Sequence, residues 1–242
     1  MLKLTETHIQ ELYKFTRKHF VYHYDVQTEL VDHLANDIED IWQAQPNLSF
    51  QDARDASFKK FGVFGFMDVI DAKQKQLGKK YHKILWKFMK EWFSVPKIIL
   101  TLLIFTFFYA LLDLNINENI FLGMMLVLAI TDVILAQKLL NKSKKRFKEK
   151  NRKYLLEDII FRAGTFNSII IFSNFFHLST FSDNIASIFG KVLFASLITL
   201  AIIYAYVTLI VIPKKAEELL IETYPEYELA KNMKQTALLI VS

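Results

Sequence analysis

The sequence contains no cysteine and, among its 242 residues, only six glycines and four prolines. Without cysteine, disulfide bonds and thiolate chemistry are excluded, although the redox compartment stays open. The scarcity of chain-breaking residues, together with a hydrophobic content of 52%, argues against a disordered chain. The composition favours a helical protein whose apolar surface exceeds what a small soluble core can bury.

The sequence also lacks the motifs of enzyme sites: no glycine-rich phosphate loop, no Cys/His cluster and no serine-nucleophile motif. His19 and His23 are four residues apart and could share a helix face, as metal ligands sometimes do. The neighbouring Tyr24 and Asp25 predict a break there, so we interpret both histidines as surface or capping residues. We therefore expect a non-enzymatic protein with no catalytic residue, cofactor or metal. The first residues form no signal-peptide run, so the N-terminal segment is expected to stay where it is made.

Long apolar runs dominate the second half of the chain. They predict four transmembrane helices at about 95–112, 120–140, 155–178 and 185–212. Each run approaches or exceeds the roughly 20 residues that cross a bilayer as a helix. The expected fold class is all-α, with a cytoplasmic helical head and a four-helix transmembrane bundle. The expected parts are a head at 1–78, a basic juxtamembrane helix at 79–94, the spans within 95–213 and a cytoplasmic tail at 214–242.

The positive charges predict the orientation of these spans. The linkers after the first and third spans contain no Lys or Arg, whereas 141–153 is dense in both. By the positive-inside rule, both termini and this basic segment are cytoplasmic. Its position between two spans favours contact with anionic headgroups over direct nucleic-acid binding. The predicted membrane-interface basic residues are Lys79, Lys80, Lys83, Lys87, Lys90, Lys144, Lys145 and Arg146.

The sequence predicts a series of capped helices in the head. Thr7 and Gln10 form a capping-box pattern for the first, Asp25 is the expected cap of the second, and Ser49 that of the third. Apolar residues recur every three or four positions along the second helix, as an amphipathic helix requires. Gly62 is expected to end the third helix, and a fourth is expected to begin near Phe64.

The same region carries short motifs in a fixed order. They are Glu29–Leu34 (ELVDHL), Asp37–Asp40 (DIED), a turn, Ser49–Ala53 with Ala56, and Phe61–Gly62. Over about residues 24–75 they resemble the bacterial permease-prefix and HAAS-type domains, small helical modules on the cytoplasmic side of membrane proteins. The turn departs from that pattern, with Gln45–Asn47 in place of the usual glycine, and a permease's large extracytoplasmic domain is lacking. The resemblance implies a regulatory or interaction module, often found near PadR-like transcriptional regulators, and no catalytic residue.

Residues 79–93 combine an apolar, aromatic-rich face with lysines. Tyr81, Leu85 and Trp92 belong to that face. This pattern is typical of a helix lying in the headgroup region. The alternative is a linker helix packed on the head. Pro96 predicts a bend into the first span.

Two charges fall inside the predicted spans. Asp132 and Arg162 lie at similar depth from the inner ends of the second and third spans, which favours an ion pair, since a lone charge inside a helix costs at least about 2.5–3.5 kcal/mol. Alternatively, Arg162 reaches the cytoplasmic interface with the help of Asp158. An ion pair between them would stabilise the packing of the two spans and would not form a transport site.

Acidic residues crowd the second helix of the head. The predicted interaction face comprises Glu29, Asp32, His33, Asp37, Glu39 and Asp40. We expect a bacterial inner-membrane protein that contacts membrane lipids and acts through protein partners, such as a larger membrane complex or a PadR-like regulator. A small transporter or channel component, an accessory subunit of an envelope complex, and a homo-oligomer remain alternatives.

Overall fold

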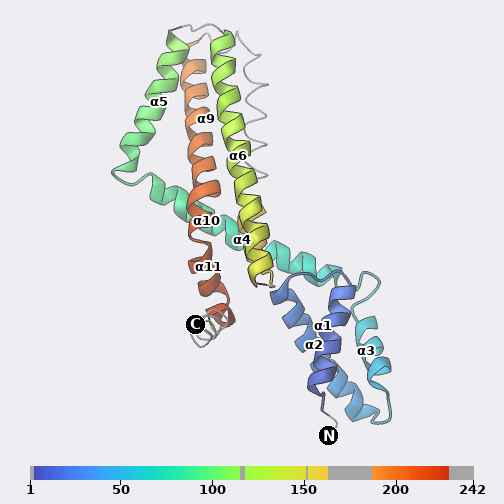
Figure 1. Ribbon diagram of the computed structural model, residues 1–242. Coiled ribbons are helices and arrows are strands. Elements are labelled where there is room, and N and C mark those ends of the chain that lie inside the picture. The colour runs from blue at the N-terminus through green and yellow to red at the C-terminus, as the bar shows by residue number, and fades with distance from the viewer. Residues whose placement is uncertain (1–2, 115–117, 151, 163–186, 229–242) are drawn as a thin grey trace. The chain divides into compact units, whose positions relative to one another are not determined.

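The computed structural model describes residues 3–114, 118–150, 152–162 and 187–228, and the regular elements among them are helices (Figure 1). The expected all-α class is confirmed for these residues. The chain divides into two compact units, Met1–Lys80 with Phe147–Leu155, and Tyr81–Arg146 with Leu156–Ser242. Most of the third predicted span, the linker after it and the apolar end of the tail lie outside the described residues.

Four helices build the first unit: α1 (Glu6–Lys18), α2 (Tyr24–Ala44), α3 (Phe50–Lys59) and the first part of α4 (Met67–Trp92). The cap predicted at Ser49 is confirmed, because its Oγ accepts the Asp52 N–H at 3.1 Å. The first helix begins two residues earlier than predicted. Thr5 is its cap and His8 completes the capping box, since both side chains accept the opposite backbone N–H.

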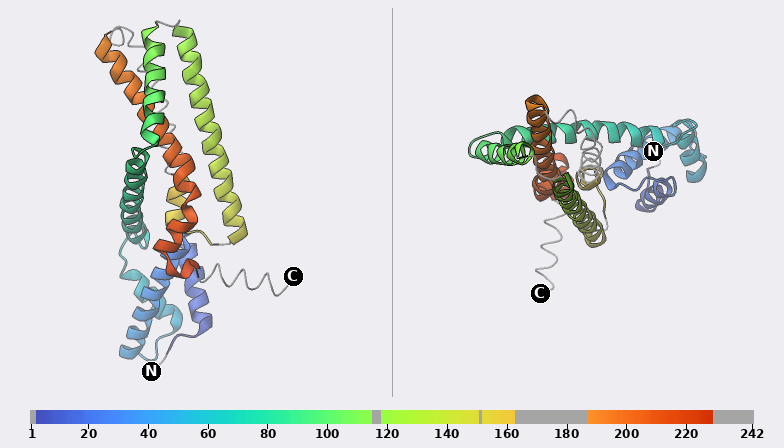
Figure 2. Two further views of the ribbon diagram at one scale, coloured as in Figure 1. Left: turned by 90° about the vertical axis from the view of Figure 1, so that its left-hand side faces the viewer. Right: turned by 90° about the horizontal axis from the view of Figure 1, so that it is seen from above.

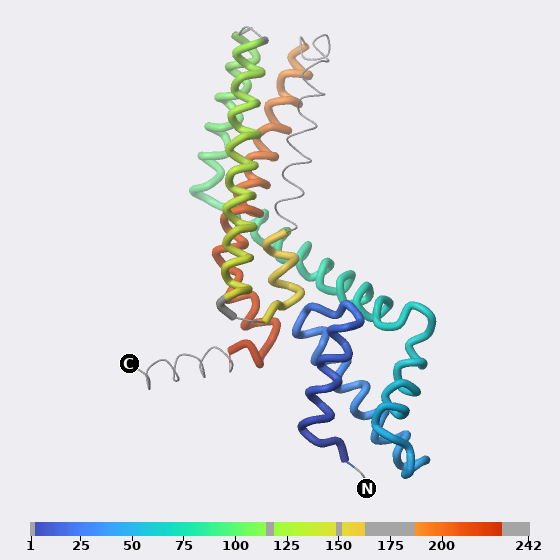
Figure 3. The backbone as a smooth tube through the Cα atoms, turned by 45° about the vertical axis from the view of Figure 1, so that its right-hand side comes forward, coloured from blue at the N-terminus to red at the C-terminus, as the bar shows by residue number. Residues whose placement is uncertain are grey.

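The core of this unit follows the apolar periodicity of α2. Val26, Leu30, Leu34 and Ile38 are fully buried, and α2 packs on both α1 and α3 (Figure 3). Between α3 and α4 the chain turns through Gly62, whose φ of 77° is a left-handed conformation that glycine adopts without steric cost. This turn delays the start of α4 to Met67, three residues after the predicted start.

The helix α4 runs without a break from Met67 to Trp92, so residues 79–92 are its second half. It meets α5 (Lys97–Asp113) at 84°, which confirms the bend predicted at Pro96. Figure 2 (right) shows α5 nearly end-on while α4 extends across the view.

The second unit also contains α6 (Glu118–Lys150), α9 (Ile188–Tyr206), a π-helical turn η1 (Val207–Val211), α10 (Ile212–Lys214) and α11 (Ala216–Thr223). Residues 155–162 are helical too. Two described helices, Asn119–Lys148 and Ile188–Lys214, are long and apolar enough to cross a membrane, and the bent pair of α4 and α5 could provide a third. The helix α6 extends into the segment predicted as a basic linker, because 141–150 contains strong helix formers and neither glycine nor proline.

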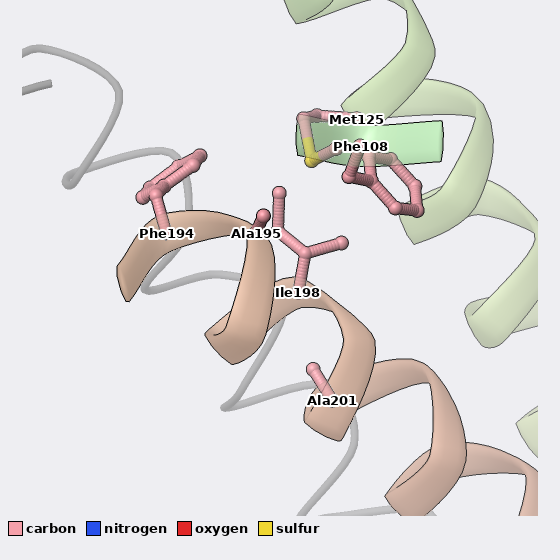
Figure 4. Close-up of a cluster of buried hydrophobic side chains, with 6 residues drawn as sticks. All are labelled: Phe108, Met125, Phe194, Ala195, Ile198 and Ala201. Atoms are coloured by element: carbon pink, nitrogen blue, oxygen red, sulfur yellow. The ribbon is translucent and has the colours of Figure 1, made fainter. Parts of the chain in front are cut away.

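The helices α5, α6 and α9 meet in one apolar cluster (Figure 4). Ala195 and Ile198 on α9 face Phe108 of α5 and Met125 of α6. Small residues such as alanine let helices approach closely, which matters where lipid rather than water surrounds them. After α9, Pro213 of α10 cannot donate a backbone hydrogen bond, and the chain forms the π-helical turn η1 just before α10.

Candidate interaction site

The start of α2 binds a segment from elsewhere in the chain. This segment, residues 152–155, comprises the linker after α6 and the first of the helical residues 155–162. The Tyr24 N–H donates to the carbonyl oxygen of Lys153 at 2.7 Å, and Asp25 Oδ1 accepts the Leu155 N–H at 3.0 Å. The Arg152 guanidinium lies 4.2 Å from the centre of the Tyr24 ring. We call these contacts the linker contact; Figure 3 shows the linker in yellow beside the blue helices of the head.

Asp25 therefore does not have the role that the sequence predicted. The N-cap of α2 is His23, which makes no side-chain capping hydrogen bond, while Asp25 lies in the first helical turn and is buried. Its carboxylate satisfies the N–H of Leu155, at the start of residues 155–162, as an N-cap side chain would. Tyr154 also takes part in the linker contact, because the centre of its ring lies 5.7 Å from that of the Tyr24 ring.

Half of the predicted acidic interaction face is occupied by contacts within the head. Glu29 pairs with Lys73 at 2.6 Å, and Asp37 pairs with Lys60 at 2.5 Å. Glu39 accepts the Leu4 N–H at 3.1 Å. The residues of the face that remain exposed on α2 are Asp32, His33 and Asp40. The surface offered to a partner is therefore narrower than the sequence implied.

The ion pair between Asp37 and Lys60 affects the pKa of the Asp37 carboxyl. Partial burial alone would raise the pKa of Asp37, but the hydrogen bond from the Lys60 ammonium helps to hold this pKa below its ordinary value. Since the pKa is lower in the folded state, the pair contributes stability above the ordinary aspartate pKa. That contribution is lost as the pH falls through the folded-state pKa.

The predicted membrane-interface basic residues do not behave alike. Exposed side chains are those of Lys79, Lys83, Lys87, Lys90, Lys144 and Lys145, while Lys80 is half-buried. Arg146 is instead enclosed in a polar cluster. The apolar face of 79–93 is also covered, because Tyr81, Leu85 and Trp92 are buried. That face therefore packs against protein and is not available to headgroups.

Arg146 links four segments of the second unit. Its Nε donates to Glu157 Oε1 at 2.8 Å. Its Nη2 donates to the Tyr227 hydroxyl at 3.4 Å and lies 3.8 Å from Glu217 Oε1. The guanidinium also lies 5.6 Å from the centre of the Phe161 ring. Only 17% of the Arg146 side chain and 8% of that of Glu157 are exposed. We call these five residues the Arg146 cluster.

The structure does not bring Asp132 and Arg162 together. Asp132 is buried on α6, in a stripe with Met125, Ala136 and Leu139, and neither carboxylate oxygen has a hydrogen-bond partner within the described part of the chain. Arg162 is exposed and forms an ion pair with Asp158 at 2.9 Å. The alternative interaction with Asp158 is thus the one observed, because a partner one turn away on the same helix needs no alignment between helices.

The described residues hold no group of three or more His, Asp or Glu side chains that could bind a metal ion. No family model matches this chain. No curated protein and no solved structure matches it either. The permease-prefix resemblance therefore rests on the motifs in residues 24–75 alone.

Sequence reasoning missed both the linker contact and the Arg146 cluster. Asp25 and Leu155 are 130 positions apart, and no pattern in one sequence relates them. The sequence does contain an indication of the Arg146 cluster, because the acidic residues Glu157 and Asp158 follow the basic segment that contains Arg146. Opposite charges at facing helix ends could have suggested this pair.

Proposed function

We propose that this chain is a non-enzymatic integral membrane protein of the bacterial inner membrane whose cytoplasmic head acts through protein partners. The observation that supports the proposal is the linker contact. A head that was joined to the rest of the protein only through the covalent chain would not need to bury Asp25 against the linker that follows the apolar helix α6. The contact gives the head a physical connection to that linker.

A partner bound to α2 would act on the linker through the helix itself. The exposed Asp32, His33 and Asp40 lie on the same 21-residue helix as Tyr24 and Asp25. A helix transmits a shift of one turn to the next because its hydrogen bonds are continuous. Partner binding would thereby tighten or loosen the linker contact, in keeping with the regulatory module that the permease-prefix resemblance implies.

The partner surface can be tested with a charge-matched pair of variants. Asp32→Asn/Asp40→Asn removes two exposed acids of α2, and Asp68→Asn/Asp71→Asn removes two exposed acids of α4 as the control. Full-length protein is purified in mild detergent, and the stoichiometry of any co-purifying protein is measured. We expect the α2 variant alone to lose the partner. High salt is expected to release the partner from the wild type as well, because salt screens charged contacts. Equal retention by both variants would exclude the α2 surface.

The proposal includes four spans with both termini in the cytoplasm, supported by the charge asymmetry of the linkers. Since the chain has no cysteine, single cysteines can be placed at the exposed Leu114 and Lys148. An impermeant maleimide is expected to label Leu114→Cys in intact cells and to leave Lys148→Cys unlabelled until the cells are lysed. The opposite labelling pattern would invert the topology.

A second candidate function, transport of protons or cations, is favoured by one observation, the buried Asp132 carboxylate. Within the described residues neither oxygen of this carboxylate has a hydrogen-bond partner, and burying such a group is costly. Ionisable groups inside spans commonly mark ion pathways. Asp132→Asn is expected to increase thermal stability in detergent. If Asp132 carries transport, the variant also reduces proton flux into proteoliposomes, whereas Asp40→Asn on the head leaves flux unchanged. Unchanged flux in both variants would rule out this function.

A further inference from the structure

The second half of α4 has two opposite faces with different surroundings. Tyr81, Leu85 and Trp92 point into the second unit and are buried. Trp92 is fixed there, because its Nε1–H donates to Thr101 Oγ1 at 3.1 Å and its ring lies 5.1 Å from that of Tyr206. This packing turns the other face of the helix outward.

The outward face carries Lys83, Trp86, Lys90 and Phe93, all exposed. Their spacing of three or four residues places them in one stripe along the helix. Trp86 is 63% exposed, and the Lys90 ammonium lies 5.8 Å from the centre of its ring. We call these four residues the lysine–tryptophan stripe. Lys87 borders it, on the side where its charge acts on Glu218.

The bend at Pro96 determines how this stripe would meet a membrane. The helix α5 is apolar and exposes Ile98, Ile99 and Leu103, as a helix in contact with lipid does. If α5 crosses the bilayer, the 84° bend places α4 close to the plane of the membrane surface (Figure 2). Tryptophan concentrates at the depth of the headgroups, where its ring is apolar and its N–H is hydrated.

We propose that the lysine–tryptophan stripe binds the headgroups of anionic phospholipids in the cytoplasmic leaflet. Lysine ammonium groups complement the lipid phosphates, while Trp86 and Phe93 provide the apolar part of an interfacial contact. The lysine–tryptophan stripe lies on the face of α4 opposite the apolar face that the sequence pattern predicted to contact headgroups. Lipid is favoured over a protein or a nucleic acid because the stripe continues directly into an apolar helix. The inference rests on the proposed cytoplasmic placement of this end, which the maleimide labelling tests independently.

The depth of the stripe can be measured in the full-length protein. Nitroxide labels are attached to single cysteines at Lys83 and Phe93, the two ends of the stripe, and at the exposed Glu222 of α11 as the control. The protein is reconstituted in nanodiscs of phosphatidylglycerol and phosphatidylcholine. We expect oxygen to reach both stripe labels better than a water-soluble nickel complex does, at a depth of about 5–10 Å. Nickel access equal to that of Glu222→Cys would show a stripe facing water and overturn the proposal.

Lipid preference tests the charge of the stripe. Lys83→Gln/Lys90→Gln is compared with Lys18→Gln/Lys59→Gln, which removes two exposed lysines from the head and changes the net charge equally. The ratio of bound phosphatidylglycerol to phosphatidylcholine is measured by native mass spectrometry. Each lysine of the stripe is expected to contribute about a fivefold preference for the anionic lipid. An equal ratio in both variants would mean that the stripe does not bind anionic headgroups, and its partner would then be a protein or a nucleic acid.

Discussion

Replacing Arg146 with methionine is expected to destabilise the protein by about 3 kcal/mol, because the variant leaves a buried carboxylate without its partner. Glu157 is almost fully enclosed, and it forms an ion pair with Arg146 at 2.8 Å. Removing one member of such a pair costs more than the pair contributes, since the remaining charge keeps its desolvation penalty. Chemical denaturation in mixed micelles, followed by circular dichroism, measures the free energy of unfolding.

Two further variants make this prediction specific. Arg146→Met/Glu157→Met is expected to recover most of the lost stability, because no charge is then buried and the methionines fill similar volumes. Lys215→Gln breaks the ion pair with Glu218, an exposed pair within one turn of chain, and is expected to change nothing measurable. A double variant as unstable as Arg146→Met would show that the cluster contributes through its shape and not through the charge pair.

The second large effect is expected at Asp25. Asp25→Ala leaves the Leu155 N–H without its acceptor in a buried position, which costs about 1–3 kcal/mol. The loss should appear locally, because the linker contact also depends on the hydrogen bond between Tyr24 and Lys153. Amide hydrogen exchange is expected to accelerate by about ten- to a hundredfold around residues 153–156, in line with that free energy.

Asparagine at the same position provides the matched control. Asp25→Asn keeps a side-chain oxygen of the same reach, so the N–H of Leu155 retains an acceptor. Exchange in this variant is expected to remain within a few-fold of the wild type. Equal acceleration in Asp25→Asn and Asp25→Ala would assign the effect to the negative charge and not to the hydrogen bond. No acceleration in Asp25→Ala would remove the linker contact as the basis of the proposed function.

A helix cap in the head was predictable from the sequence where the capping side chain and its backbone partner are only a few residues apart. Ser49 caps α3 as expected, because a cap needs only a side-chain oxygen and an N–H three residues later. Asp25 satisfies the same composition rule and yet serves another segment. A carboxylate near a helix start can accept from any nearby N–H, and sequence does not reveal which N–H the fold brings there.

The acidic face of α2 shows a similar limit. Its six residues follow from the sequence, but Lys73, Lys60 and the Leu4 N–H remove half of them from the free surface. Ion pairs between elements depend on packing angles and on rotamers, neither of which is encoded by spacing. The same reason explains Arg162, which pairs with Asp158 on its own helix and not with Asp132.

Composition and hydrophobic runs by themselves determined that the described residues are mainly helical and that at least two of their helices are long and apolar enough to cross a membrane. Proline at 96 likewise determined the bend between α4 and α5. These properties depend on backbone sterics and on the cost of exposing apolar side chains to water, which act over a few turns of chain. Only the tertiary structure decided that Asp25 binds the linker, that Arg146 is enclosed, and that α4 presents Trp86 outward. Each of these depends on which surfaces meet across more than ten residues of sequence, and packing selects those surfaces only when the whole chain has folded.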